Sequence, residues 1–224
     1  MAETHSTLVE HSPDLQHHFD DMGQQFDAAT LGMWAFLLTE IMFFGGMFGA
    51  YTVYRGMYPE AFASTSKLLN TWLGAVNTAV LICSSLTMAM AVRAAQMGQK
   101  KLLIWMLVFT MIFGAAFLGV KAYEYHDKWV EHLIPGLGFE YKDTQYFHQA
   151  QILFLLYFAM TGFHALHMVI GFGILSTLLV MAIRNRFSPE WYTPVEISGL
   201  YWHFVDIVWI FLFPLLYLIG LHQH

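Results

Sequence analysis

Three polar patterns stand inside long apolar stretches and have the side chains best suited to chemistry. His164 and His167 are three residues apart, as are His203 and Asp206, so each pair lies on one face of a helix. Glu40 stands alone inside the first apolar stretch. Imidazoles on one face can bind a metal, and a carboxylate beside an imidazole can orient it or accept its proton. Metal binding, proton handling and structural hydrogen bonding are therefore the roles to distinguish.

Five apolar runs carry these residues and determine the fold class. They lie near 31–54, 68–92, 102–123, 152–183 and 197–221, after a polar N-terminal segment, 1–30. Hydrophobic residues make up 57% of the chain and charged residues 12%, about half the charged share of a soluble domain. About 20 apolar residues span a bilayer as a helix. The sequence therefore predicts an all-α polytopic membrane protein in which residues 31–224 form one bundle of five transmembrane helices.

Composition also excludes several classes of protein. A water-soluble enzyme is incompatible with the apolar runs, and a net charge of −6 without a basic cluster argues against nucleic acid as a partner. The chain has no P-loop, no dinucleotide-binding glycine fingerprint, no CxxC pair and no HExxH motif. Its single cysteine, Cys83, cannot form an internal disulfide. No signal peptide is expected, because residues 1–30 lack Lys, Arg and a leading apolar stretch.

Glu40 is the acid whose burial in the membrane is most costly. A central charge costs about 2.5–3.5 kcal/mol on insertion scales, and such residues face a bundle or a water path. The apolar side chains of Phe36, Phe43, Phe44 and Met47 disfavour its charged form. Gly45 and Gly49 predict the close approach of another helix. Two interpretations stay open: a protonated acid bonded to a neighbouring helix, and a proton-relay or lipid-contacting acid.

The histidines favour structural roles. No carboxylate accompanies His164 and His167 as in di-iron bundles, and two imidazoles on one helical turn cannot bind opposite faces of a haem. We expect a neutral pair that bonds to other helices. His203 and Asp206 are expected to form an internal imidazole–carboxylate pair, with partner contact or proton handling as the alternative.

Counts of Lys and Arg leave the orientation tied. The N-terminus and the connections after the second and fourth spans carry five in total, and the other side also carries five, with Lys121 counted in the loop after the third span. Compact basic clusters at 93–101 and 184–186 lie on the first side, which favours its cytoplasmic location. We therefore expect a cytoplasmic N-terminus and a periplasmic C-terminus.

Each span contains one segment of a known pattern. The segments are Thr39-Glu40-Ile-Met-Phe-Phe, Asn77-Thr-Ala-Val-Leu-Ile-Cys-Ser-Ser-Leu-Thr, Phe117-Leu-Gly-Val-Lys-Ala-Tyr-Glu124-Tyr, Thr161-Gly-Phe-His164-Ala-Leu-His167 and Tyr201-Trp-His203-Phe-Val-Asp206-Ile-Val-Trp209. In this order they resemble subunit III of the haem–copper terminal oxidases (cytochrome c or quinol oxidase subunit 3) across residues 30–220. Lys121 stands where glutamine is common and Ala165 where glycine is. The chain resembles the five-helix bacterial versions, which lack the two leading helices of the seven-helix form.

The resemblance implies an accessory subunit without a redox centre. Such a subunit packs against catalytic subunit I and other oxidase subunits, with haem and copper held in the partner, and binds membrane phospholipid. It supports assembly, proton uptake and resistance to turnover-linked inactivation. Glu40 matches the family's intramembrane, carbodiimide-reactive glutamate, and Arg184 matches a lipid head-group contact. The other matched signature positions are Glu124, His164, His167, His203 and Asp206. Like Glu40 and Arg184, Glu124 is expected to take part in proton handling or lipid binding, and the remaining four are expected to be structural polar residues.

The expected function is therefore that of an accessory subunit of a proton-pumping respiratory oxidase in a bacterial inner membrane. The chain itself is expected to hold no catalytic residue, metal or cofactor. One alternative is a self-sufficient b-type membrane cytochrome with His164, His167 and His203 as haem ligands. The other is an accessory subunit of a related nitric oxide reductase.

Overall fold

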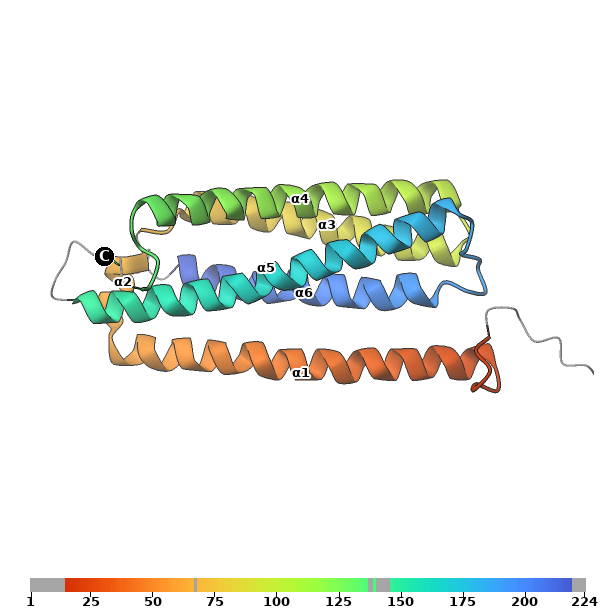
Figure 1. Cartoon of the computed structure of the whole chain (residues 1–224), viewed down its shortest axis with the longest axis horizontal. Coiled ribbons are helices and arrows are strands. Elements are labelled where there is room, and N and C mark those ends of the chain that lie inside the picture. Colours follow the sequence, from red (N-terminus) through yellow and green to blue (C-terminus); the bar gives the residue numbers. More distant parts are fainter. Residues whose placement is uncertain (1–14, 67, 137–138, 140–145, 219–224) are drawn as a thin grey trace, which may run out of the picture.

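The computed structural model describes residues 15–66, 68–136, 139 and 146–218. Every regular element within these residues is a helix. The elements are α1 (Met22–Met57), α2 (Pro59–Ser66), α3 (Thr71–Gln96), α4 (Lys100–Val130), α5 (Phe147–Ile183) and α6 (Thr193–Tyr217) (Figure 1). Five of these helices, all except α2, are long and apolar enough to cross a membrane. The predicted all-α polytopic bundle is confirmed.

Several helices extend beyond the apolar runs. The α1 helix begins at Met22, inside the segment predicted to be polar and separate, because the side chain of Asp21 caps it by accepting a hydrogen bond from the Gln24 amide at 2.7 Å. The α4 helix continues to Val130, and the short helix α2 occupies a connection expected to be a loop. Hydropathy marks only the part of a helix that lies in hydrocarbon, so polar helical turns beyond it leave no such signal.

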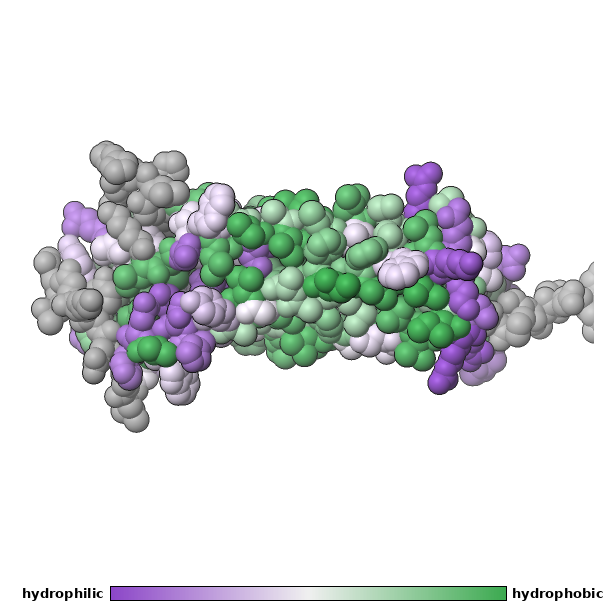
Figure 2. Space-filling view, turned by 90° about the horizontal axis from the view of Figure 1, so that it is seen from above, coloured by the Kyte–Doolittle hydropathy of each residue, from purple (hydrophilic) through white to green (hydrophobic). Residues whose placement is uncertain are grey.

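The surface and length of the helices fit a membrane. On the face shown in Figure 2, apolar residues cover the middle of the molecule and hydrophilic residues gather at both ends. The 37 residues of α5 correspond to about 55 Å of helix, longer than a hydrocarbon core of about 30 Å. This helix slants across the bundle in Figure 1. Exposed Trp72 and Trp129 lie at one end of the bundle and Trp105 near the other, as expected for residues at membrane interfaces.

The α6 helix lies at the centre of the bundle and α1 at its edge (Figure 1). Thirteen side chains of α6 are buried, including Trp202 and Trp209. By contrast, α1 buries only Leu37, Phe44 and Tyr51, spaced by seven residues in a single narrow stripe. The α3, α4, α5 and α6 helices therefore form the packed core, and most of the circumference of α1 is free.

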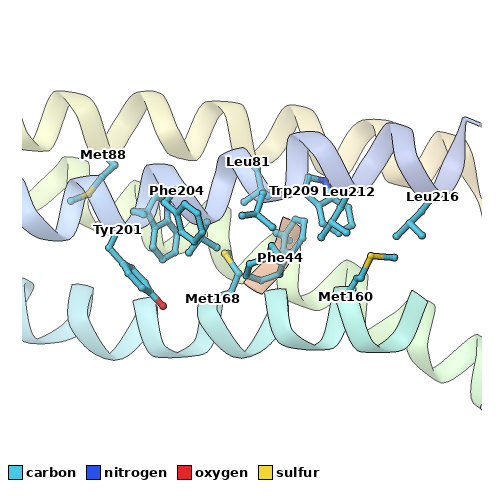
Figure 3. Close-up of a cluster of buried hydrophobic side chains, with 14 of the residues drawn as sticks. Phe44, Leu81, Met88, Met160, Met168, Tyr201, Phe204, Trp209, Leu212 and Leu216 are labelled. Carbon is cyan, nitrogen blue, oxygen red and sulfur yellow. The ribbon is translucent and has the colours of Figure 1, made fainter. Parts of the chain in front are cut away.

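The indole of Trp202 joins four helices. A Cβ placed on Gly171 of α5 would lie 2.8 Å from this ring, and one on Gly114 of α4 would lie 3.0 Å from it. Its Nε1 donates a hydrogen bond to Ser84 Oγ of α3 at 3.0 Å. Two turns of α6 further along, Trp209 points with Leu81 and Met168 into the same interior (Figure 3). Small residues at these positions let the helices approach closely enough to enclose the aromatic rings.

Candidate functional site

Glu40 and His167 meet across a groove between α1 and α5. Glu40 Oε2 lies 3.1 Å from His167 Nε2, and His167 Nδ1 lies 2.7 Å from the carbonyl oxygen of Phe163. The side chains are 19% and 12% exposed, respectively. The groove has a volume of about 580 Å³, and its walls are mostly apolar; the lining side chains nearest in sequence to the pair are Phe36, Thr39, Phe43, Phe163, Leu166 and Ile170. The acid therefore bonds to a neighbouring helix and also faces an open apolar surface.

His164 has different surroundings from His167 although the two are three residues apart. Its ring is buried against Phe117 and Trp209, with ring centroids 5.4 and 5.3 Å away. Among the described residues, neither of its ring nitrogens has a hydrogen-bond partner. The expected pair thus divides: His167 bonds to α1, whereas His164 packs in the core between α4 and α6.

The expected bond between His203 and Asp206 is wrong. His203 Nδ1 instead lies 2.7 Å from Ser85 Oγ on α3. Both carboxylate oxygens of Asp206, which is 2% exposed, lack a hydrogen-bond partner within the described part of the chain. A spacing of three residues allows two side chains to meet, but the α3 helix packs against this face of α6 and offers the imidazole a hydroxyl partner.

Glu124 belongs to a buried network that sequence reasoning did not identify. Lys121 Nζ donates to Glu124 Oε2 at 2.8 Å, to Tyr157 Oη at 3.1 Å and to Tyr217 Oη at 3.0 Å. Both tyrosine hydroxyls donate to Glu124 Oε1, at 2.9 and 2.6 Å. All three ammonium hydrogens and both carboxylate oxygens are therefore used, which is the condition under which a buried ion pair is tolerated.

Aromatic rings enclose the ammonium group of this network. Lys121 Nζ lies 5.0 Å from the ring centroid of Trp209 and between 5.1 and 5.6 Å from those of Tyr125, Tyr157 and Tyr217. Each contact is within the range of a cation–π interaction. The network thereby connects α4, α5 and α6. The spacing of Lys121 and Glu124 in an otherwise apolar helix was the available signal, but the tyrosines come from 36 and 96 residues away from Lys121.

The count of basic residues placed Lys121 in a loop, but the structure places it inside a helix. It is 4% exposed and lies nine residues before the end of α4, or about 14 Å along the helix. Lys128 also lies in α4, where it pairs with Glu131 at 2.6 Å. Arg184 follows the last residue of α5 and is exposed, which suits a contact at the membrane end.

The three histidines of the cytochrome alternative do not converge on one site. His167 contacts Glu40 and its own helix, His203 contacts Ser85, and His164 packs among aromatic rings. Within the residues that the structure describes, no three His, Cys, Asp or Glu side chains are placed to hold a metal ion together.

Comparison with known proteins identifies the family that these features belong to. The family model of cytochrome c oxidase subunit III matches residues 17–221, which include all five long helices. The chain belongs to the cytochrome c oxidase subunit III family. It is thus an accessory subunit of a haem–copper oxidase, as the resemblance of the five segments implies.

Individual subunit III proteins are similar in sequence to this chain over most of their length. Cytochrome c oxidase subunit 3 of Alkalihalophilus pseudofirmus is 34% identical over 85% of this chain and 86% of its own. The subunit of the same name from Thermostichus vulcanus is 31% identical over 86% and 88%. Cytochrome bo(3) ubiquinol oxidase subunit 3 of Pseudomonas putida is 30% identical over 89% and 88%. These names are those of oxidase subunits, which favours an oxidase over the nitric oxide reductase alternative.

Proposed function

We propose that this subunit III lies beside catalytic subunit I in a bacterial inner membrane and holds phospholipid along α1. A second groove, between α1 and α6, carries this proposal. Its volume is about 460 Å³, and among the described residues that line it only His203 has an ionisable side chain. The remaining lining residues are Trp34, Leu37, Ile41, Phe44, Gly45, Phe48, Leu200, Phe204, Ile207, Val208 and Phe211. A hydrocarbon chain matches such walls because it needs no hydrogen-bond partner.

The packing of α1 supports a lipid in this groove. Within the described part of this chain, a Cβ on Gly45 or Gly49 would meet nothing within 4 Å, so none of the chain's described helices makes the close approach expected at these glycines. The space beside Gly45 is instead part of the groove. Arg184, exposed at the end of α5, offers a charge for a phosphate head group at the surface.

Filling the groove is expected to remove lipid from the oxidase complex. Gly45→Leu places a side chain in the groove, whereas Gly32→Leu adds the same side chain to α1 at another open position that does not line it. We expect native mass spectrometry of the purified complex to find less phospholipid bound with Gly45→Leu and wild-type content with Gly32→Leu. The Gly45→Leu complex should begin with normal oxygen reduction and lose activity in fewer turnovers. Equal lipid content in the two variants would contradict the proposal.

We also propose that Glu40 supports proton uptake by the catalytic subunit. Glu40→Gln retains the shape and a hydrogen bond to His167, so the subunit should assemble at wild-type stoichiometry. We expect slower proton uptake or a lower pumping ratio in reconstituted vesicles, with oxygen reduction continuing because the metal centres belong to another chain. Unchanged pumping would limit Glu40 to a structural role. A fully assembled variant without any oxygen reduction would contradict the accessory role itself.

The proposed orientation places the N-terminus in the cytoplasm and the C-terminus in the periplasm. The buried position of Lys121 supports it, because removing this residue from the loop count leaves four basic residues against five. In spheroplasts, a membrane-impermeant thiol reagent should label a cysteine introduced at Trp129, which is exposed at the end of α4. It should not label one introduced at Gln99 until the cells are opened. The reverse pattern would invert the topology.

A further inference from the structure

Hydrogen-bond chemistry fixes one proton on His167. Its Nδ1 lies 2.7 Å from the carbonyl oxygen of Phe163, and a carbonyl oxygen only accepts. Nδ1 must therefore carry a hydrogen. In the neutral ring, the other nitrogen, Nε2, then has a free lone pair that accepts.

A second proton must lie between His167 and Glu40. Nε2 and Glu40 Oε2 are 3.1 Å apart, and two bare acceptors do not approach in this way without a hydrogen between them. Either Glu40 is a carboxylic acid that donates to Nε2, or Glu40 is a carboxylate that accepts from an imidazolium. Both arrangements contain one proton in the bond and have zero net charge. Adding or removing a proton would leave one net charge in an apolar groove, which is costly in a membrane.

We propose that His167 is the positioning residue of Glu40, and that the two side chains share a single proton across the α1–α5 groove. The shared bond ties α1 to α5 and keeps the groove without net charge. It is the only side-chain hydrogen bond from residues 31–57 to another helix among those of the described residues. The inference rests on the proposed function in one respect: a neutral groove suits an uncharged hydrocarbon chain as its occupant.

The groups around the pair are consistent with this assignment. Tyr201 of α6 donates its hydroxyl hydrogen to the backbone carbonyl of His167 at 2.9 Å, and its ring stacks on the imidazole with centroids 6.5 Å apart. It is the only other ionisable side chain lining the groove within the described residues. His164, on the same helix, faces the core, and His203 of α6 lines the other groove. The pair therefore has no other charged group in the groove to balance a net charge.

Infrared difference spectroscopy of the intact oxidase complex in lipid tests the shared proton. Subtracting the spectrum of Glu40→Gln from that of the wild type isolates the vibrations of the Glu40 carboxyl group. Subtracting the spectrum of the Glu40→Gln/His167→Phe double variant from that of His167→Phe isolates the vibrations of the Glu40 carboxyl group in the absence of the imidazole. We expect the Glu40 signal to change, because phenylalanine offers no acceptor: a hydrogen-bonded C=O band moves to higher frequency, or a carboxylate band is replaced by that of an acid.

The matched control is Thr177→Ala on the same helix, whose hydroxyl is exposed and bonds only to the Gly173 carbonyl of its own helix. Its Glu40 signal should equal that of the wild type. If His167→Phe does not assemble, His167→Leu, which also offers no acceptor, provides the same comparison. A Glu40 signal that is identical with and without His167, or that changes equally in Thr177→Ala, would overturn the assignment. This measurement does not depend on lipid content or proton pumping. The proposed function can therefore be wrong while the shared-proton assignment is right, and the assignment can be wrong while the proposed function is right.

Discussion

Replacing Lys121 by methionine is expected to cost about 3–5 kcal/mol of folding free energy and to deplete this subunit from the purified complex. The substitution leaves Glu124 without its cationic partner at a site where the side chains of the pair are only 5% and 6% exposed. The hydroxyls of Tyr157 and Tyr217 would still donate to the carboxylate, but they do not neutralise it. The subunit-to-complex ratio from quantitative mass spectrometry, measured during stepwise heating, reports the loss.

The chain offers a control of the same geometry for this prediction. Lys128 and Glu131 are also three residues apart on α4, but the Glu131 side chain is 52% exposed. The Lys128 side chain is only 8% exposed, but Glu131 keeps its contact with water, so removing Lys128 leaves no buried charge without a partner. The subunit should therefore be retained in the Lys128→Met complex nearly as well as in the wild type. The double variant Lys121→Met/Glu124→Leu should regain much of the loss, because it removes both charges. Equal retention of Lys121→Met and Lys128→Met would show that the buried network does not stabilise the bundle.

Trp202→Ala is expected to have an effect of similar size, about 3–5 kcal/mol. The indole is 1% exposed and contacts Gly114 and Gly171 on two neighbouring helices, so its removal leaves a cavity that the helix backbones cannot fill without moving. Ser84 would also lose the hydrogen bond from the indole nitrogen. The temperature at which the subunit leaves the complex should fall.

Trp105→Ala is the matched control for Trp202→Ala. Trp105 is 60% exposed, and surface substitutions usually change stability by less than about 0.5 kcal/mol. Its release temperature should remain near that of the wild type. If the two alanine variants release the subunit at the same temperature, the α3–α6 core does not depend on the central indole.

The membrane spans were predictable from sequence because hydropathy measures what a bilayer selects. The five apolar runs locate the long helices, yet they place the start of α1 too late in the chain and the end of α4 too early. Helix formation continues outside the hydrocarbon wherever backbone hydrogen bonds and caps support it, as Asp21 does for α1. Hydropathy contains no information on these turns or on the short α2 helix.

Pairing between side chains was predictable only in part. Spacing on one helix correctly placed His167 toward another helix, but it also suggested a bond between His203 and Asp206, whereas His203 bonds to Ser85 of α3. The network around Lys121 depends on residues from three helices. Contacts between distant segments require knowledge of helix packing, which a single sequence does not contain.

The bond between Glu40 and His167 has a consequence for biosynthesis. The two residues are 127 positions apart, and ribosomes add about 5–20 residues per second. The first helix therefore enters the bilayer roughly 6–25 s before its histidine partner is made. During that interval the acid has neither His167 nor the groove around it, and Phe44 lacks its ring contacts with His167 and Phe204. The nascent chain thus depends on the insertion machinery, or on a neighbouring subunit already in the membrane, to hold its first helix until α5 and α6 are complete.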